Sequence, residues 1–251
     1  MCLVVSIGAG SQCEPAPLRL RIKFYDRLID TMFPNWAKNI LFLLVYMISG
    51  LVLLVIIEGL HSGTELTPLN TVIEKVVTHM RTPSLTTLMV LITRIGDPFF
   101  LASATALIAV LLFIRGRRYD AALFVVTLIV AVISLTVLKN TFQITRPNSG
   151  IYSSDGWSFP SGHATVATAF FFMLAHTLFH RMRTPAKKTM LIAGCILAVA
   201  LISFTRIYLG AHWTLDILAG VALGLLSVSF TALIFSVFIG ERRSLRTRIN
   251  M

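Results

Sequence analysis

The chain has 251 residues, of which 56% are hydrophobic and 13% are charged, whereas soluble domains are roughly half apolar and a quarter charged. So few charged side chains cannot cover the surface of a soluble protein of this size, which excludes a disordered or ordinary cytosolic protein and predicts a membrane protein. The net charge is +11, but the basic residues form short clusters between long uncharged stretches, which argues against a nucleic-acid partner.

Six stretches lack Asp, Glu, Lys and Arg, and each is close to the roughly 17–25 residues that span a bilayer as a helix. They are Asn39–Ile57, Pro98–Ile114, Ala121–Leu138, Gly156–His180, Thr189–Thr205 and Ile217–Gly240. The pattern predicts an all-α, polytopic bundle of six transmembrane helices. A shorter run, Thr82–Thr93, precedes a Gly96-Asp97-Pro98 step that breaks helical geometry. The sequence leaves open whether this run is interfacial, re-entrant or a kinked lower part of the second span.

The Lys and Arg residues between the spans alternate between the two sides of the predicted bundle. One side has sixteen of the 22, namely Arg19, Arg21, Lys23, Arg27, Lys38, Arg115, Arg117, Arg118, Arg181, Arg183, Lys187, Lys188, Arg242, Arg243, Arg246 and Arg248. The other side has Lys75, Arg81, Arg94, Lys139, Arg146 and Arg206. Because Lys and Arg near helix ends stay in the cytoplasm, both termini are predicted to be cytoplasmic.

No repeat or low-complexity tract divides the chain, so one membrane domain is expected at residues 36–240. It would follow a cytoplasmic or interfacial segment, residues 1–35, and precede a basic cytoplasmic tail, residues 241–251. No basic segment precedes the apolar start of the chain, so no signal peptide is predicted. The three cysteines have no metal-ligand or disulfide pattern. The Gly220-x3-Gly224 pair favours packing within the bundle over a dimer face.

Ionisable groups also cluster at span ends on the outer side, where such groups are costly unless they pair or line a cavity. The three clusters are Lys139 with Arg146-Pro147, then Phe159-Pro160-Ser161-Gly162-His163, then Arg206 with His212 and Asp216. Each cluster is therefore a candidate functional site by default.

The third cluster has the composition of an oriented nucleophile. If the sixth helix begins near Ala211, His212 and Asp216 lie one turn apart on the same face. The carboxylate can then accept the proton of one imidazole nitrogen and leave the other nitrogen free to attack. His163, if protonated beside a bound phosphate, can serve as the general acid, so the two histidines need opposite protonation states.

The second cluster has the composition of an anion site. Pro160 stands just before an expected helix start, so the amides of Ser161, Gly162 and His163 fall among the unpaired N–H groups of the first turn. Three cationic donors would add to these amides: Lys139, Arg146 and Arg206. They suffice to surround phosphate oxygens and to balance the charge that magnesium balances in other enzymes, so no metal or other cofactor is required.

These residues resemble the three-part signature of the type 2 phosphatidic acid phosphatase (PAP2) superfamily. The matching pattern is Lys139-x6-Arg146-Pro147, Pro160-Ser161-Gly162-His163 and Arg206-x5-His212-x3-Asp216. One departure is Thr205, where the family usually has Ser before the arginine, and Thr keeps the hydroxyl. The resemblance spans Lys139–Asp216 directly and the six-helix layout extends it, leaving out the N-terminal segment and Glu58–Asp97.

The resemblance implies a phosphohistidine mechanism in which His212 is the nucleophile, Asp216 orients it and His163 is the general acid. It carries the family's phosphate ligands onto Lys139, Arg146, Ser161, Gly162 and Arg206. Membrane members of the family act on lipid phosphates or diphosphates. The soluble relatives, acid phosphatases and vanadate-dependent haloperoxidases, are excluded by the hydropathy.

The predicted function is hydrolysis of a lipid phosphate or diphosphate at the outer face of a bacterial inner membrane. Within the family, a compact chain resembles bacterial enzymes for undecaprenyl diphosphate, phosphatidylglycerophosphate or lipid A, and an outward-facing site favours undecaprenyl diphosphate. A lipid phosphotransferase shares the first half-reaction and stays open, as does the oligomeric state. An anion transporter is the alternative from a different class, and it would require charges at the bilayer midplane and two related halves.

Overall fold

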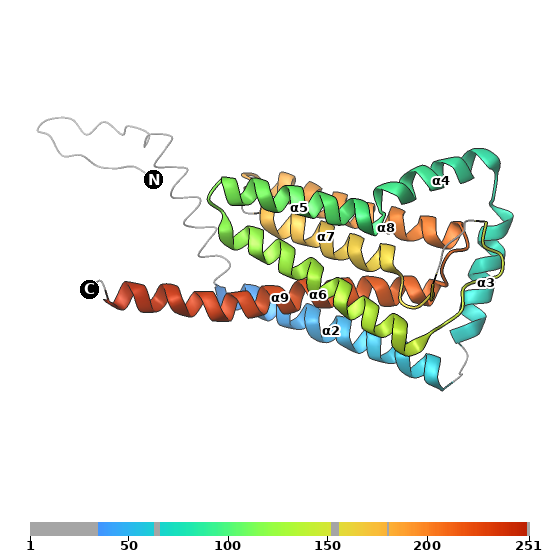
Figure 1. Cartoon of the computed structure of the whole chain (residues 1–251), viewed down its shortest axis with the longest axis horizontal. Helices are drawn as coiled ribbons and strands as arrows, with labels where there is room; N and C mark the ends of the chain where they lie inside the picture. The colour runs from blue at the N-terminus through green and yellow to red at the C-terminus, as the bar shows by residue number, and fades with distance from the viewer. Residues whose placement is uncertain (1–34, 63–65, 152–155, 180, 250–251) are drawn as a thin grey trace, which may run out of the picture. The chain divides into compact units, whose positions relative to one another are not determined.

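The computed structural model describes residues 35–62, 66–151, 156–179 and 181–249, which form eight α-helices and no strand within those ranges. The helices are α2 (Asn35–His61), α3 (Leu66–His79), α4 (Pro83–Ile95), α5 (Pro98–Ile114), α6 (Arg118–Phe142), α7 (Gly162–Phe179), α8 (Pro185–Tyr208) and α9 (Thr214–Ile249) (Figure 1). Contacts divide the chain into two units, residues 1–41 and 42–251. Of the first unit only residues 35–41 are described, so the predicted segment 1–35 lies outside the described residues apart from Asn35.

Five of the described helices, α2, α6, α7, α8 and α9, are long and apolar enough to cross a membrane. Helices α4 and α5 are also long and apolar enough when taken together, with a bend of 40° between them. The predicted all-α membrane bundle is therefore confirmed. The run Thr82–Thr93 belongs to α4 and its N-cap, and the bend joins it to α5, an arrangement that fits either a kinked span or a re-entrant segment.

Short polar and proline signals set the helix starts. Asp97 caps α5 by accepting hydrogen bonds from the amides of Phe99 (2.9 Å) and Phe100 (3.3 Å), with Pro98 as the first helical residue. Proline fits that position because its missing N–H would have no partner in the first turn. The chain therefore bends between α4 and α5 because Asp97 and Pro98 start a new helix there.

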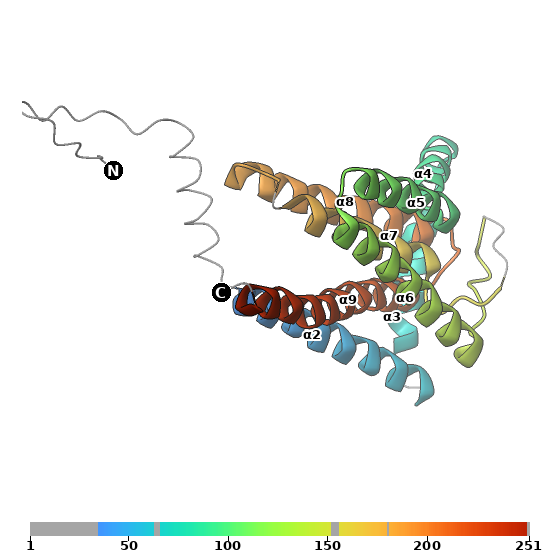
Figure 2. The ribbon, with the colours of Figure 1, turned by 60° about the vertical axis from the view of Figure 1, so that its left-hand side comes forward.

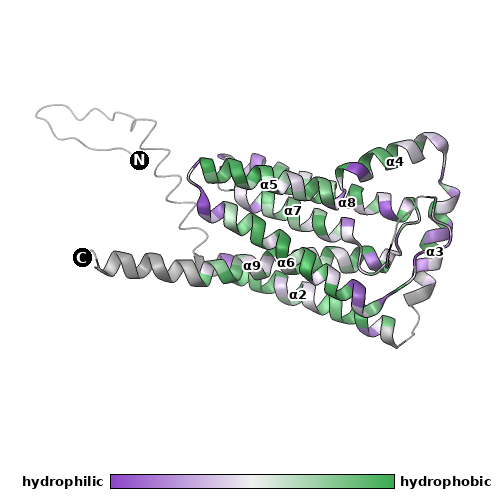
Figure 3. Cartoon of the chain, viewed as in Figure 1, coloured by the Kyte–Doolittle hydropathy of each residue, from purple (hydrophilic) through white to green (hydrophobic). Residues whose placement is uncertain are grey.

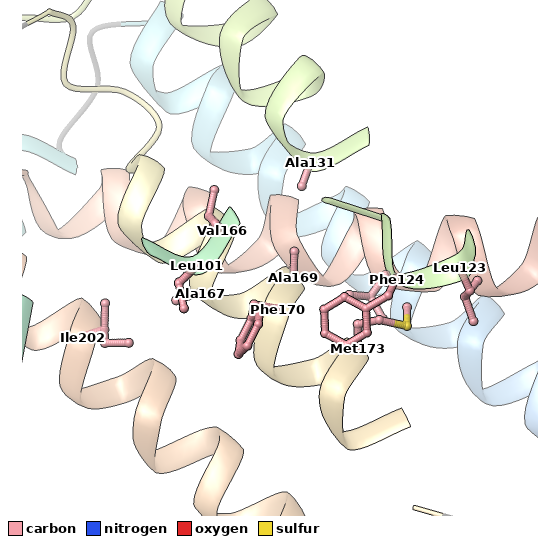
Figure 4. Close-up of a cluster of buried hydrophobic side chains, with 11 residues drawn as sticks. Leu101, Leu123, Phe124, Ala131, Val166, Ala167, Ala169, Phe170, Met173 and Ile202 are labelled. Atoms are coloured by element: carbon pink, nitrogen blue, oxygen red, sulfur yellow. The ribbon is translucent and has the colours of Figure 1, made fainter. Parts of the chain in front are cut away.

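Helices α7 and α9 form the centre of the bundle. In the most apolar stretch of each helix, the share of residues that are buried is 56% for α7 and 61% for α9, against 17% for α2. Around α7, the largest apolar cluster among the described residues joins side chains of α5, α6, α7, α8 and α9, including Leu101, Phe124, Phe170, Met173 and Ile202 (Figure 4). The Ser161 amide, directly before α7, donates to the carbonyl oxygen of Asp216 in the first turn of α9 at 3.0 Å, so the two helix starts lie side by side.

The Gly220-x3-Gly224 pair lies in the contact between α9 and α7. A Cβ atom at Gly224 would stand 2.6 Å from Cβ of Thr168 and 2.8 Å from the carbonyl oxygen of Thr165. A Cβ atom at Gly220 would stand 2.8 Å from the carbonyl oxygen of Ser161. Both glycines therefore serve close packing inside the bundle, as the sequence favoured.

Apolar side chains cover the outward surfaces of the spans, as lipid contact requires. Leu51 and Leu54 of α2 are 62% and 64% exposed, and Leu107 of α5 is 61% exposed. Figure 3 shows hydrophobic colour along the spans and hydrophilic colour concentrated toward their ends.

At one end of the second unit, α6 and α8 end and α7 and α9 begin, and α3 packs against α8 and α9 there (Figures 1 and 2). The turns that join α5 to α6 and α7 to α8 lie at the opposite end. The predicted fourth span began at Gly156, but α7 begins only at Gly162. Residues 156–161 instead form a non-helical segment beside the ends of the spans.

Candidate active site

The ends of α6, α7, α8 and α9 bring the three predicted clusters together. Arg146, in the connection after α6, lies with Nη1 3.3 Å from Nε2 of His212, between α8 and α9. His163, in the first turn of α7, interacts electrostatically with both of these side chains and with Lys139 and Arg206. The two histidines therefore lie at one site, as the sequence predicted.

His212 and Asp216 pair as expected, although the helix starts later than expected. Helix α9 begins at Thr214 rather than near Ala211, so His212 precedes the helix and Asp216 lies in its first turn. His212 Nδ1 stands 3.5 Å from Asp216 Oδ2, with side chains 3% and 2% exposed. Asp216 Oδ2 also accepts the Trp213 amide at 2.9 Å, which caps the helix. The same carboxylate thus orients the imidazole and caps α9.

His212 is held neutral by its surroundings. Burial lowers its pKa to about 4, and the guanidinium groups of Arg146 and Arg206 act in the same direction against the raising effect of Asp216. A neutral imidazole with Nδ1 toward a carboxylate has its lone pair on Nε2, the nitrogen that faces Arg146. This is the protonation state that a nucleophile needs.

The start of α7 departs from the expected anion site at one amide. The Ser161 amide donates to the carbonyl oxygen of Asp216 at 3.0 Å. This amide therefore holds α7 against α9, and the role of Ser161 as a phosphate ligand stays a prediction. The Gly162 and His163 amides have no hydrogen-bond acceptor among the described residues. These two amides are the ones left for an anion.

Lys139 and Arg146 lie along the segment that precedes α7. Lys139 Nζ donates to the Trp157 carbonyl oxygen at 2.5 Å, and Arg146 Nη2 donates to the same oxygen at 3.3 Å. Arg146 also donates to the carbonyl oxygens of Gly156 (3.0 Å) and Ala211 (2.6 Å). Backbone carbonyl groups thus fix both cations, and Arg146 is the one that lies beside His212.

Arg206, in the last turn of α8, is 2% exposed and reaches a residue that the sequence did not single out. Its Nη1 donates to Oγ1 of Thr93 at 3.1 Å, and Thr93 of α4 is 1% exposed. Thr93 lies in the run whose role the sequence left open. Nothing in its sequence surroundings indicates a contact with an arginine more than a hundred residues away.

Helix α3 lies beside His212. Asn70 and Glu74 line a pocket with Pro147, His212 and Trp213. Asn70 accepts the Leu215 amide at the start of α9 (3.3 Å), and the Ser149 hydroxyl donates to Glu74. The role of this region was left open by the sequence, and the structure places it against the site.

Comparisons with known proteins agree with this geometry. The sequence profile of the PAP2 superfamily matches residues 120–239, which contain all three clusters. The chain is 30% identical over 157 residues to phosphatidylglycerophosphatase B of Bacillus subtilis (strain 168), covering 61% of this chain and 77% of that protein. It is 31% identical over 157 residues to an undecaprenyl-diphosphatase of Sulfolobus acidocaldarius, covering 60% of this chain and 70% of that protein.

A solved structure shares the fold. The crystal structure of a transmembrane PAP2-type phosphatidylglycerolphosphate phosphatase from Bacillus subtilis matches with a TM-score of 0.71 and 25% identity, covering 77% of this chain and 96% of that one. The chain therefore belongs to the PAP2 superfamily, in its integral-membrane lipid phosphatase branch. It is a phosphatase, and the comparisons favour this activity over the anion transporter.

Proposed function

We propose that this protein hydrolyses a phosphate ester or anhydride of a membrane lipid through a phosphohistidine formed on His212. The observation that carries the proposal is the setting of that imidazole. It is buried and neutral, Asp216 lies on its Nδ1 side, and Arg146 lies 3.3 Å from its Nε2. The neutral Nε2 can attack phosphorus, and the guanidinium group beside it can position the phosphate and stabilise the negative charge of the transition state.

The proposed reaction has two steps. Lys139, Arg146, Arg206 and the Gly162 and His163 amides hold the phosphate. The Nε2 lone pair of His212 forms the N–P bond while the P–O bond to the leaving group breaks, and His163 gives its proton to the leaving oxygen. Water then gives a proton to His163 as its oxygen attacks phosphorus, and the N–P bond to His212 breaks. Inorganic phosphate leaves, with the His212 imidazole neutral and His163 protonated again.

The site is proposed to face the outside of a bacterial inner membrane, with both termini in the cytoplasm. The basic turns at Arg115–Arg118 and Arg181–Lys188 lie at the end of the bundle opposite the site. Since basic loops stay in the cytoplasm, their position supports an outward site. A lipid would place its phosphate among the cations and its tails beside the exposed apolar surfaces of the spans.

Undecaprenyl diphosphate is the proposed substrate, with phosphatidylglycerophosphate and lipid A as the alternatives. The relatives named above act on phosphatidylglycerophosphate and undecaprenyl diphosphate, so their names support both of the first two. An outward site suits the recycling of a lipid carrier, which favours the diphosphate. A lipid phosphotransferase would form the same phosphohistidine and differ only in the acceptor.

The test is a phosphate-release assay on the purified protein with these three lipids, with and without a second lipid as acceptor. We expect free phosphate from one lipid in preference to the others, with EDTA leaving turnover intact and vanadate inhibiting. His212→Ala should lower kcat by at least about 10³-fold and abolish the acid-labile phosphoenzyme. His79→Ala is the matched control, because His79 is an exposed histidine of α3 that bonds the Lys75 carbonyl oxygen of its own helix.

Three results would contradict the proposal. Near-normal turnover by His212→Ala would remove the nucleophile, and a strict requirement for magnesium would remove the charge balance by cations alone. Transfer of the phosphoryl group to the second lipid, in place of release of free phosphate, would make the protein a phosphotransferase.

A further inference from the structure

Ser158 is a buried residue of the segment before α7 that the proposed reaction does not use. It is 0% exposed, and its backbone amide donates to the carbonyl oxygen of Ile144 at 2.7 Å. The next residue, Phe159, is also fully buried and packs edge-on against Phe142 at the end of α6, with ring centres 5.5 Å apart. Contacts on both sides therefore fix the position of the Ser158 hydroxyl.

This hydroxyl lies between the carboxylate and the imidazole of the site. Ser158 Oγ donates to Oδ2 of Asp216 and stands 3.4 Å from Nδ1 of His212. The distance from Nδ1 to Oδ2 of Asp216 is 3.5 Å, so the hydroxyl is as near to Nδ1 as the carboxylate is. The same Oδ2 already accepts the amide of Trp213 at 2.9 Å.

We propose that Ser158 is a positioning residue for His212, and that with Asp216 it keeps the imidazole proton on Nδ1 and the lone pair on Nε2. A neutral imidazole carries one N–H, and the acceptors beside one nitrogen decide which nitrogen carries it. The Ser158 oxygen accepts from Nδ1–H while its own proton points to Asp216, so no proton is transferred and no bond is broken. The inference rests on the proposed function, because it matters only if Nε2 attacks the phosphate.

The arrangement also relieves the crowding at the carboxylate. Oδ2 of Asp216 receives donors from Ser158 and from the Trp213 amide, and it also faces Nδ1 of His212. The imidazole proton therefore shares this oxygen with two other donors, and the hydroxyl oxygen of Ser158 offers it a second acceptor. Ser158 thus joins His212, Asp216 and His163 in the proposed mechanism.

A purely structural hydroxyl would behave differently. It would only tie the segment before α7 to the start of α9, so its loss would lower stability and leave the chemistry of the folded protein unchanged. A positioning hydroxyl acts on the attacking nitrogen, so its loss lowers kcat and changes the pH profile. The two roles therefore separate in kinetics.

The experiment compares Ser158→Ala with Ser158→Thr in the full-length protein, using the lipid that the release assay identifies. For Ser158→Ala we expect kcat to fall by about 10- to 100-fold, with KM within about twofold of the wild type. The acid limb of kcat/KM should move to higher pH. Without the hydroxyl, the Asp216 carboxylate is less neutralised and favours the imidazolium form more strongly. Ser158→Thr keeps the hydroxyl and should restore both properties.

Ser227→Ala is the matched control. Ser227 is also 0% exposed, and its hydroxyl donates to the Leu223 carbonyl oxygen of its own helix at 2.8 Å. It reports what the loss of a buried hydroxyl does by itself. A double variant, Ser158→Ala with Asp216→Asn, should lose less kcat than the product of the two single losses, because both residues act on Nδ1.

A Ser158→Ala enzyme with kcat within about threefold of the wild type and an unchanged pH profile would overturn the inference. If Ser158→Ala does not fold, Ser158→Cys decides, because it fills a similar volume with a weak donor and acceptor. A loss of kcat greater than about threefold then supports the inference, and a smaller loss overturns it. An active His212→Ala enzyme would remove the proposed function itself, whereas an inactive His212→Ala enzyme with a fully active Ser158→Ala enzyme removes only this inference.

Discussion

At the scale of single residues, His212 combines burial with opposing charges. Asp216 favours its imidazolium form and two guanidinium groups oppose it, while burial is the largest effect. The balance keeps the ring neutral, so the carboxylate orients the imidazole without making it cationic. This is how a histidine in a strongly cationic site can serve as a nucleophile instead of adding one more positive charge.

This balance predicts a pH dependence of stability. The pKa of His212 falls from 6.5 to about 4 on folding, so between these values the unfolded chain binds more protons than the folded chain. His212 therefore costs stability as the pH falls through this range and costs nothing above it. His212→Gln should reduce the loss of thermal stability between about pH 7 and about pH 5, measured on the purified protein in detergent.

The exposed His79 supplies the control for this measurement, since His79→Gln should leave the pH dependence of stability as it is in the wild type. If the His212→Gln and wild-type curves stay parallel across the range, the imidazole of His212 is not the buried neutral group that the structure indicates.

At the scale of elements, each helix end delivers one part of the site. The ends of α6 and α8 supply Lys139 and Arg206, and the starts of α7 and α9 supply His163 and Asp216. The Ser161 amide, which donates to the Asp216 carbonyl oxygen, joins the last two helices directly. Helix α4 adds Thr93 as the hydroxyl partner of Arg206.

The role of α4 gives a prediction for Thr93→Val. Valine has a similar shape but no acceptor, so the buried Arg206 guanidinium would lose a hydrogen bond worth about 1.5–3 kcal/mol for a charged donor. We expect kcat/KM to fall by about 10-fold or more, and Thr93→Ser to keep most of the activity. The measurement is the phosphate-release assay on detergent-purified variants.

Thr105→Val in α5 is the matched control for Thr93→Val. Thr105 is also buried, and its hydroxyl donates to the Leu101 carbonyl oxygen of its own helix at 2.8 Å. Equal losses of kcat/KM in Thr93→Val and Thr105→Val would show that the contact with Arg206 has no special part in phosphate binding.

At the scale of the whole molecule, the distribution of charge predicts the orientation in the membrane. Single cysteines at Asn148 and Ala186, in a chain whose own cysteines are replaced, report the two ends of the second unit, and both positions are exposed. We expect a membrane-impermeant maleimide added to intact cells to label Asn148→Cys and not Ala186→Cys, because the loop near Ala186 is basic and stays inside.

Permeabilised cells are the control for this labelling, since both cysteines should then react. Labelling of Ala186→Cys in intact cells, with Asn148→Cys protected, would place the site in the cytoplasm and contradict the proposed orientation.

The sequence by itself determined the apolar spans, the alternation of basic loops and the three clusters. Spans and loops are set by transfer of side chains between water and lipid, which acts residue by residue along the chain. The clusters could be predicted because their chemistry depends on residue type and short spacing, as with His212 and Asp216. The bend before α5 was also visible, because Asp97 and Pro98 are local signals.

Only the tertiary structure decided which groups complete the site. The contact of Arg206 with Thr93 joins residues far apart in the chain, and so does that of Ser158 with Asp216. Neither has a local signature, because helix packing brings these residues together and spacing along the chain does not. The contact of the Ser161 amide has the same origin: a first-turn amide is open to a ligand unless another helix supplies an acceptor, and α9 supplies one to this amide.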